Sequence, residues 1–197
     1  IAELIKQIGE KARSASNSLR IASTSQKNNA LISIANQIQE SKQIILDANQ
    51  IDLNAARKNA IDDRLLVRLM LNNERLNSVI EGLHQISTLN DPIGQISDFK
   101  ERPSGIKIGK MMVPLGVIGM IYESRPNVTV DAAGLCIKSG NAIILRGGSE
   151  AINSNIAFYS CIEKGLEDAG LDSNSVQLIK VTDRKVVTHL VSASDHV

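Results

Sequence analysis

Apolar side chains in the first ninety residues recur every three or four positions, which is the spacing of amphipathic helices. The spacing predicts helices over this half of the chain, and a short apolar segment at 65–70 follows two acidic residues that suit a helix start. We expect the apolar faces of these helices to lie in the core. Four faces are identified: Leu4, Ile8 and Ala12; Leu31, Ile34, Ala35 and Ile38; Ile44, Ala48, Ile51 and Ala55; and Leu76, Val79, Ile80 and Leu83.

The pattern changes after a break at 90–92, where Asn, Asp and Pro interrupt the helical spacing. Over 96–113, apolar residues stand among lysine, arginine and glycine, and the tripeptide Pro103-Ser104-Gly105 is a turn signal. This stretch predicts a β-hairpin or a pair of extended strands.

The middle of the chain has the pattern of a strand, a helix and a second strand. Val117–Ile121 is an apolar run of strand length, Thr129–Lys138 has helix length, and Ala142–Leu145 is another short apolar run. Gly140 stands where a helix C-terminal glycine belongs. This order is the crossover unit that joins two parallel strands.

The alternation continues toward the end of the chain. A polar turn at 146–148 leads into a helix that begins near Ser149 and closes near 169–170. An apolar strand at 176–181 and a helix beginning at Asp183 follow. Strands and helices in strict alternation predict a doubly wound sheet.

These elements together predict an α/β fold, with a helical N-terminal segment followed by a Rossmann-like parallel sheet and with an antiparallel hairpin between them. We expect three parts: a helical part at 1–90, an extended arm at 91–113, and the βαβ sheet at 114–197. The sheet is not convincingly finished where the chain stops. We therefore expect the chain to be part of a longer protein, with a further domain beyond it.

Two polar loops, 122–127 and 146–150, follow the first two predicted parallel strands. Ligands of open parallel sheets bind beyond the carboxyl ends of the strands, so these loops predict a binding site. In the second loop Arg146 supplies a cation, two glycines allow close backbone approach, and Ser149 can cap the next helix, a combination that suits an anion. An ordinary strand-to-helix turn with a surface arginine fits the same spacing equally well.

The first loop also has two interpretations. Ser124, Arg125 and Asn127 are polar groups at the carboxyl end of a strand, which favours binding. The same stretch fits a helix start, with Pro126 in the first turn and Asn127 or Ser124 as the cap. Neither a G-x-G-x-x-G fingerprint nor a Walker A sequence is present, so a dinucleotide would have to be held in another way.

Composition excludes several classes of function. The net charge is +1 with dispersed lysine and arginine, and aromatic residues make up only 2%, so nothing suggests nucleic acid or a lipid surface as a partner. Because no apolar run approaches the length of a membrane helix, we expect no membrane span. The two cysteines do not form a disulfide framework, which indicates the cytoplasm.

Cysteine and histidine positions give neither a catalytic nor a metal signal. Cys136 and Cys161 lie on predicted helices without a basic partner nearby in sequence, so we interpret them as small buried hydrophobic residues rather than nucleophiles. His84, His189 and His196 lack metal-ligand spacing among themselves or with cysteine, and we assign no metal.

One long ungapped stretch resembles a known family. The sequence PLGVIGMIYESRPNVTVDAAGLCIKSGNAIILRGGSEAINSN resembles the γ-glutamyl phosphate reductase (glutamate-5-semialdehyde dehydrogenase) family of the aldehyde dehydrogenase superfamily, above all in ESRPNVT followed by LCIKSGNAIILRGGSEA. The similarity extends over the whole chain, and the segments DPIG at 91–94 and RPSG at 102–105 also look like the family's pattern. The resemblance implies an aldehyde dehydrogenase-like cofactor domain.

The resemblance also implies a reaction, the reduction of L-glutamate 5-phosphate by NADPH to L-glutamate 5-semialdehyde and phosphate, which is a step of proline biosynthesis. In the family a cysteine thiolate attacks the acyl phosphate, phosphate leaves, and hydride reduces the thioester. That cysteine lies beyond the segment where this chain stops and cannot be matched to Cys136 or Cys161. The resemblance therefore implies an N-terminal, cofactor-binding part that is inactive alone.

Cofactor contacts follow from the same resemblance. The loop Ile121-Tyr122-Glu123-Ser124 should border the nicotinamide ribose, and Arg146 falls where aldehyde dehydrogenases carry a lysine that contacts the adenosine ribose. An arginine at that position suits the 2′-phosphate of NADP. We expect Gly147, Gly148 and Ser149 of the same turn to take part in cofactor binding.

On the substrate side, Ser124 stands where aldehyde dehydrogenases usually have an asparagine that helps form the oxyanion hole, which leaves the oxyanion donor open. Arg125 and Asn127 are the expected contacts for the phosphate or carboxylate of the substrate. The resemblance further implies a small acyl phosphate as substrate, a homo-oligomer built through the hairpin, and functional coupling to glutamate 5-kinase.

Two other functions stay open from the sequence. One is another member of the superfamily that oxidises a different aldehyde. The other is a non-catalytic nucleotide-binding or interaction module whose helical half docks a partner.

Overall fold

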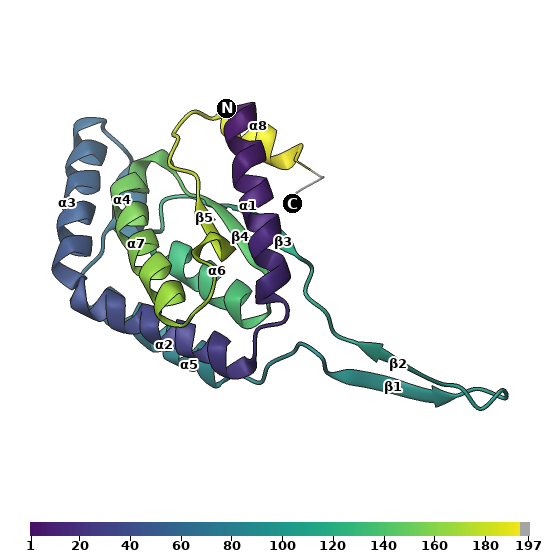
Figure 1. Cartoon of the computed structure of the whole chain (residues 1–197). Coiled ribbons are helices and arrows are strands. Elements are labelled where there is room, and N and C mark those ends of the chain that lie inside the picture. Colours follow the sequence, from purple (N-terminus) through teal and green to yellow (C-terminus); the bar gives the residue numbers. More distant parts are fainter. Residues whose placement is uncertain (194–197) are drawn as a thin grey trace.

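The first ninety residues fold into helices, as their apolar spacing predicts. The computed structural model describes residues 1–193 of the chain (Figure 1). This part contains α1 (Ala2–Leu19), α2 (Thr24–Glu40), α3 (Lys42–Lys58), α4 (Asp63–Leu69) and α5 (Asn73–Thr88). Ser23 and Gln26 form a capping box at the start of α2, because each side chain accepts a hydrogen bond from the other residue's backbone N–H. The short α4 begins after Asp62, whose carboxylate accepts from the Arg64 N–H.

Two of the four predicted apolar faces are placed differently in the structure. Leu4 is exposed, and its neighbour Ile5 is buried instead. On α3 the expected face is wrong: the side chains of Ile44 and Ile51 are 66% and 57% exposed. The buried face of α3 lies one position further along and includes two polar residues: Ile45, Asn49, Asp52, Leu53 and Ala56. Because the inward polar groups form hydrogen bonds, apolar spacing alone selected the wrong side of this helix.

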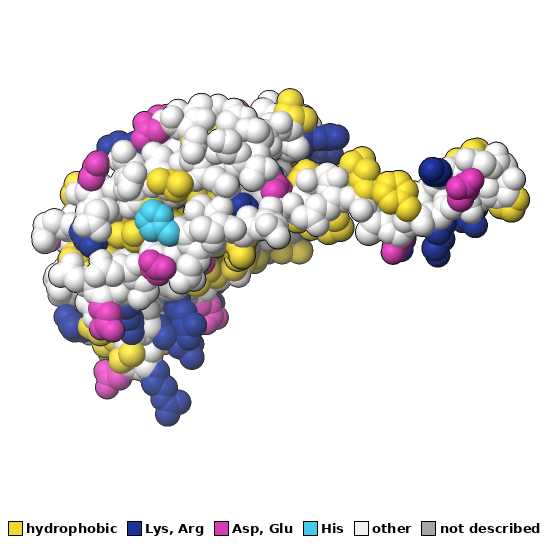
Figure 2. Space-filling view, turned by 90° about the horizontal axis from the view of Figure 1, so that it is seen from below, with side chains coloured by type: hydrophobic (Ala, Val, Ile, Leu, Met, Phe, Trp, Pro, Cys, Tyr) yellow, Lys and Arg dark blue, Asp and Glu magenta, His cyan; other side chains and the backbone are white. Residues whose placement is uncertain are grey.

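The stretch between the helices and the sheet forms the predicted hairpin. Strands β1 (Ile96–Glu101) and β2 (Lys107–Met111) pair antiparallel, with an irregularity between Ser97 and Lys100. All residues of both strands are exposed. Figures 1 and 2 show the pair projecting away from the body as an arm, with hydrophobic side chains along it.

An ion pair fixes the base of this arm to the helical part. The Lys27 ammonium on α2 lies 2.5 Å from the Asp91 carboxylate, and both side chains are largely shielded from solvent. The Thr24 hydroxyl and the Ile93 N–H also donate to this carboxylate. Burial of Asp91 raises its pKa, but these hydrogen bonds and the charge of Lys27 outweigh burial and lower the pKa below its ordinary value.

The second half of the described chain forms the predicted parallel sheet. Its elements in order are β3 (Val117–Ile121), α6 (Asn127–Lys138), β4 (Ala142–Arg146), the 3-10 turn η1 (Ser149–Ala151), α7 (Ile152–Asp168), the 3-10 turn η2 (Ser173–Ser175), β5 (Val176–Leu178) and α8 (Lys185–Val191). The strand order within residues 1–193 is β3-β4-β5, all parallel. The third strand is shorter than predicted, since its ladder ends where the Ile179 N–H donates to the Leu145 carbonyl.

Helices cover both faces of this sheet. Strand β4 is buried throughout, and its side chains alternate between two clusters. Ile143 and Leu145 join the larger cluster, which α2, α5, α6 and α7 complete, while Ala142 and Ile144 join a smaller one under α1 and α8. The arrangement is the doubly wound α/β fold that the alternation of elements predicts.

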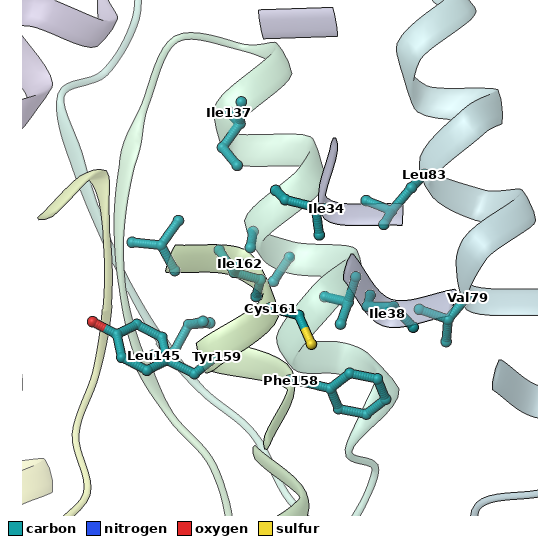
Figure 3. Packing of buried hydrophobic residues seen from close by; sticks show 14 of the residues in the cluster. Ile34, Ile38, Val79, Leu83, Ile137, Leu145, Phe158, Tyr159, Cys161 and Ile162 are labelled. Atoms are coloured by element: carbon teal, nitrogen blue, oxygen red, sulfur yellow. The ribbon is translucent and has the colours of Figure 1, made fainter. Parts of the chain in front are cut away.

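The larger cluster is the main core of the described chain. Figure 3 shows part of it, formed by side chains from α2, α5, α6, α7 and β4: Ile34, Ile38, Val79, Leu83, Ile137, Leu145, Phe158 and Ile162. This core holds the helical half against the sheet, so it also fixes the position of the loops at the carboxyl ends of the strands. No helix in residues 1–193 combines the length and apolar character required to cross a membrane.

Candidate functional site

The two polar loops predicted to form a site lie side by side. The N–H of Tyr122 donates to the carbonyl of Arg146, which extends the pairing of β3 and β4 by one step. Beyond it, the Glu150 carboxylate accepts from the backbone N–H of Ser124 at 2.9 Å and from the Ser124 hydroxyl at 2.6 Å. The carboxyl ends of β3 and β4 are therefore joined through side chains as well as backbone.

Glu150 belongs to the turn at which the sequence predicts anion binding. Burial of this carboxyl group raises its pKa, but the hydrogen bonds from Ser124 and from its own N–H, with the charge of Arg146, lower the pKa below the ordinary value. Gly148 leaves the room for it, because a Cβ there would lie 2.1 Å from Oε1 of Glu150. The Glu150 carboxylate thus links the turn after β4 to Ser124 of the first loop.

A cavity of about 760 Å³ opens beside these loops. It brings together seven of the eight residues predicted to bind a cofactor: Ile121, Tyr122, Glu123, Ser124, Arg146, Gly148 and Ser149. Its other walls come from Glu150 of the second predicted loop and from segments that the sequence did not indicate: 59–62, Leu65, Arg184, Val187 and Thr188. Arg184 follows the third strand, so the rule that selected the first two loops also applies to it.

Arg146 is buried to 9% exposure, and its guanidinium lies across the ends of two strands. Nη1 donates to the Gly147 carbonyl at 2.8 Å, and Nη2 donates to the Thr182 carbonyl at 3.2 Å. Its Nε is buried and has no hydrogen-bond partner among the described residues. The alternative of an ordinary surface arginine is therefore wrong. Arg184, by contrast, is an exposed cation on the wall of the same cavity.

Gly147 packs beneath the cavity against a buried polar network. A Cβ on this residue would lie 2.3 Å from Nδ2 of Asn155 and 3.0 Å from the Tyr122 ring. The Tyr122 hydroxyl is 2.6 Å from Oγ1 of Thr129, and the Thr129 hydroxyl donates to Asn155 at 3.0 Å. Burial raises the pKa of Tyr122 to about 12, against a smaller lowering by Thr129, so the phenol stays neutral.

The cap predicted for the helix after this turn is wrong. Ser149 opens the 3-10 turn η1, and α7 begins three residues later. The free N–H groups at its start are met by Asp52 of α3, whose carboxylate accepts from the Asn153 and Ser154 N–H groups at 3.2 and 2.8 Å. The Ser154 hydroxyl donates to the same carboxylate at 2.6 Å. The cap comes from a residue about one hundred positions away.

The cap proposed for the helix after the first loop is also wrong. Helix α6 begins at Asn127, directly after Pro126. Within the described chain, neither Asn127 nor Ser124 caps it with a side-chain hydrogen bond. Asn127 instead donates to Oδ2 of Asp131 at 3.0 Å, one turn along the helix. Burial of Asp131 raises its pKa, with a smaller lowering from Asn127.

Arg125 and Asn127 lie in a different cavity from the cofactor-binding candidates. This second cavity, of about 500 Å³, is lined by Val67, Arg68, Arg75, Ser78, Val79, Arg125, Asn127 and Asp131. Ser124 and Arg125 are adjacent in sequence but line separate cavities. The loop 122–127 therefore stands between the two predicted groups of binding residues.

The cysteines are placed as the sequence predicts. Cys136 and Cys161 are both buried and free. Burial raises the pKa of Cys136 to about 11 and also raises that of Cys161, so both stay protonated and poorly nucleophilic near neutrality. Among residues 1–193 no group of three or more His, Cys, Asp or Glu side chains is arranged to hold a metal. His196 lies outside the described residues.

Comparison with known proteins decides which family these features resemble. No protein-family model matches the chain. All 197 residues align with the "Gamma-glutamyl phosphate reductase" of Ruthia magnifica at 55% identity, covering 47% of that protein. Over its whole length the chain is similar in sequence to proteins named γ-glutamyl phosphate reductase, at 50–55% identity. The resemblance inferred from the 114–155 stretch is thereby confirmed, and the chain spans about half the length of the curated relatives that it matches.

Solved structures agree with this result. The "Gamma-glutamyl phosphate reductase" of Thermotoga maritima superposes with a TM-score of 0.95 at 40% identity, over 98% of this chain and 47% of that one. A "probable aldehyde dehydrogenase" from Listeria monocytogenes superposes with a TM-score of 0.70 at 16% identity, over 95% of this chain and 39% of its own. That second likeness shows a shared fold, so the described chain has the architecture that γ-glutamyl phosphate reductases share with aldehyde dehydrogenases.

Proposed function

We propose that this chain is the cofactor-binding part of an enzyme that uses NADPH to reduce L-glutamate 5-phosphate to L-glutamate 5-semialdehyde and phosphate, a step of proline biosynthesis. The observation that carries the proposal is the 55% identity to a named γ-glutamyl phosphate reductase over every residue of the chain. The aligned region covers the whole chain, so it includes the loops at the site as well as the core.

The larger cavity fits NADPH on three grounds. It lies beyond the carboxyl ends of the parallel strands, where nucleotides bind in folds of this type. Its volume, about 760 Å³, is in the range of cofactor sites. Arg146 and Arg184 line it, and the buried Nε of Arg146 lacks a partner among the described residues, so a donor is left for a ligand oxygen.

Within this cavity we assign separate tasks to the two loops. Arg146, Gly148 and Ser149 face the adenosine ribose and its 2′-phosphate, while the segment 121–124 borders the nicotinamide end. When bound, NADPH supplies the hydride. Gly147 lies beneath the cavity and supports the turn, because its lack of a side chain lets the Tyr122–Thr129–Asn155 network pack against the turn.

Ser124 positions the loop, and it does not stabilise the oxyanion that develops on the substrate during the reaction. A hydroxyl has one proton to donate, and the Ser124 hydroxyl donates it to Glu150 at 2.6 Å. Its backbone N–H donates to the same oxygen. The oxyanion donor therefore comes from another group of the complete enzyme.

The attacking thiolate also comes from outside this chain. Cys136 and Cys161 are buried, and burial raises the pKa of each. A thiolate is the nucleophilic form, so neither residue is suited to attack an acyl phosphate. The purified chain should bind the cofactor and show no reductase activity.

We also propose how the protein associates. The arm exposes apolar side chains and two unpaired strand edges, which suit pairing with a second copy of the chain. Functional coupling to glutamate 5-kinase would suit a reactive acyl phosphate substrate, and two free cysteines are in keeping with a reducing cytoplasm.

A titration of the purified chain with NADPH and NADH tests the cofactor assignment. NADPH should bind at least tenfold more tightly, since a charged hydrogen bond to the 2′-phosphate contributes on the order of 1.5–3 kcal/mol. Arg146→Ala should reduce this preference, and Arg184→Ala reports separately on the second cation. Arg20→Ala, an exposed arginine at the end of α1, is the matched control. Equal binding of the two cofactors would overturn the assignment of Arg146.

A further inference from the structure

The second cavity collects charged groups from three separate parts of the chain. Arg68 comes from α4, Arg75 from α5, and Arg125 from the loop before α6, while Asp131 lies on α6 itself. The cavity has a volume of about 500 Å³, which suits a small metabolite. Three guanidinium groups and one carboxylate thus line a space too small for a dinucleotide but large enough for an amino-acid derivative.

The three arginines differ in how they are held. Nη1 of Arg75 donates to the carbonyls of Val67 and Met70 near the end of α4, which fixes this side chain against the cavity wall. Within residues 1–193, the guanidinium groups of Arg68 and Arg125 make neither a hydrogen bond nor an ion pair. Their donors are therefore free for a ligand, and the planar guanidinium favours carboxylate and phosphate oxygens.

The carboxylate is also held in place. Asn127 donates to Oδ2 of Asp131 at 3.0 Å, so the other oxygen is left for a different donor. The Asp131 side chain is half-buried, which strengthens its interaction with any cation that enters the cavity. An ammonium group would be such a cation.

We infer that this cavity binds the amino-acid end of an acyl phosphate, with Arg68 and Arg75 on its α-carboxylate, Asp131 on its α-ammonium and Arg125 toward its phosphate. The inference rests on the proposed function and extends it to residues of α4 and α5. L-Glutamate 5-phosphate carries anionic phosphate and carboxylate groups and one ammonium. The cavity is lined by groups of opposite charge to these, three cations and one anion.

The order of these groups follows from the loop between the cavities. Arg125 adjoins Ser124, which lines the cofactor cavity, so we assign Arg125 to the reacting end of the substrate. Arg68 and Arg75 come from the helical half, on the other walls of the cavity. A substrate laid along this path has its acyl phosphate at the loop and its amino-acid end between α4, α5 and α6.

Asp131 makes the inference specific. A cavity that only collected anions would bind L-glutamate and N-acetyl-L-glutamate about equally, since both carry two carboxylates. A cavity with a carboxylate placed for an ammonium prefers the free amine, because acylation removes the positive charge and leaves Asp131 without a partner.

Nuclear magnetic resonance titration of the chain with inorganic phosphate, L-glutamate and N-acetyl-L-glutamate tests this, with the arginine side-chain signals as the probe. L-Glutamate should shift the signals of Arg68 and Arg75, and phosphate should shift that of Arg125. L-Glutamate should bind roughly tenfold more tightly than N-acetyl-L-glutamate, the size of one charged hydrogen bond. Asp131→Asn should remove that preference.

Arg68→Gln should weaken L-glutamate binding by about tenfold, and this variant keeps the fold intact because the side chain is exposed. Arg75→Gln should also weaken L-glutamate binding, and it should lower the stability of the fold because the Val67 and Met70 carbonyls lose their donor. Arg64→Gln, an exposed arginine on the same short helix but outside the cavity, should bind as the unmodified chain does. Equal binding of the two amino acids, absence of saturable binding at tens of millimolar, or normal binding by Arg68→Gln would each overturn the inference.

The outcome is separable from that of the proposed function. If the chain binds L-glutamate through these residues but the complete enzyme does not reduce L-glutamate 5-phosphate, the site stands and the proposed reaction fails. If the complete enzyme reduces that substrate with an unchanged KM in the Arg68→Gln and Asp131→Asn variants, the reaction stands and the site fails.

Discussion

Glu150 accepts two hydrogen bonds from Ser124, one from the backbone N–H at 2.9 Å and one from the hydroxyl at 2.6 Å. The two residues lie on different loops, 26 positions apart, at the carboxyl ends of β3 and β4. The pair forms part of the wall of the larger cavity and uses the carboxylate that the turn after β4 would otherwise offer to solvent. It therefore makes the shape of the site depend on a residue that the sequence did not identify as a binding residue.

Glu150→Gln should loosen this wall. The amide keeps one oxygen for Ser124 but loses the charge that makes both hydrogen bonds strong, so we expect a loss of about 1 kcal/mol in the free energy of unfolding. Hydrogen exchange at the Ser124 N–H should accelerate by more than at the core of β4. Glu167→Gln, an exposed carboxylate near the end of α7, is the control. An unchanged exchange rate at Ser124 would show that the pair does not hold the loop.

Asp52→Ala should destabilise the chain by about 3 kcal/mol. The substitution leaves the Asn153 and Ser154 N–H groups and the Ser154 hydroxyl without their acceptor at a buried helix start. Urea denaturation measures the loss. Asp47→Ala on the same helix removes an exposed carboxylate that, among residues 1–193, accepts only from the Gln43 side chain, and it should change stability by less than about 0.5 kcal/mol. Similar losses in the two variants would contradict the capping role.

Asp91→Asn should produce a pH-dependent loss of stability. At neutral pH the variant leaves the buried Lys27 ammonium without its counter-ion, at a cost of roughly 3 kcal/mol. The pKa of Asp91 is lower in the folded chain than its ordinary value of 3.8, so its charge contributes stability above that value and loses the contribution as pH falls through the folded pKa.

Urea midpoints at several pH values check this prediction. The difference between the unmodified chain and Asp91→Asn should be largest above the ordinary pKa of 3.8 and should shrink as pH falls through the lowered folded pKa, because Asp91 then becomes as uncharged as the asparagine. Asp98 on the exposed arm pairs, within the described part of the chain, only with the exposed Lys110, so Asp98→Asn should show little effect on stability at any pH. A difference for Asp91→Asn that stays constant with pH would exclude the charge as its cause.

Gly165→Ala should destabilise the chain by about 2 kcal/mol or more. A Cβ on Gly165 of α7 would lie 2.6 Å from the backbone nitrogen and 2.8 Å from Cα of Ile34 on α2, and backbone cannot move aside as a side-chain end can. Gly82→Ala on α5 is the matched control, because a Cβ there meets nothing within 4 Å. It should stabilise the chain by about 0.5–1 kcal/mol through helix propensity. Thermal unfolding of the two variants should therefore shift in opposite directions.

Much of the fold followed from local patterns in the chain. The helical spacing at 1–90, the turn signal at 103–105 and the alternation after Val113 each correspond to elements of the structure. The wrong face predicted for α3 arose because polar residues take inward positions on that helix. On α3 the inward Asn49 and Asp52 hid the buried face, since their hydrogen bonds to Leu69, Leu71 and Ser154 come from distant segments.

The candidate site followed from the sequence only in part. Position at the strand ends selected loops 122–127 and 146–150, because the carboxyl ends of parallel strands share one edge of a sheet. The same rule applies to Arg184, which follows the third strand, but it does not select Arg68 or Arg75, which reach the second cavity from α4 and α5. An exposed arginine on a short helix has no local signature that distinguishes a ligand contact from a solvated surface charge.

The sequence by itself determined which segments become strands and helices, and it carried the resemblance in its ungapped 114–155 stretch. The tertiary structure decided which face of α3 is buried, that Asp52 caps α7, and that Ser124 and Arg125 line separate cavities. Backbone periodicity records each residue's neighbours within about one helical turn or two strand positions. The cap on α7 and the charges around the second cavity come from residues that are distant in sequence. Their positions depend on how the helices pack against one another, and only the folded chain contains that information.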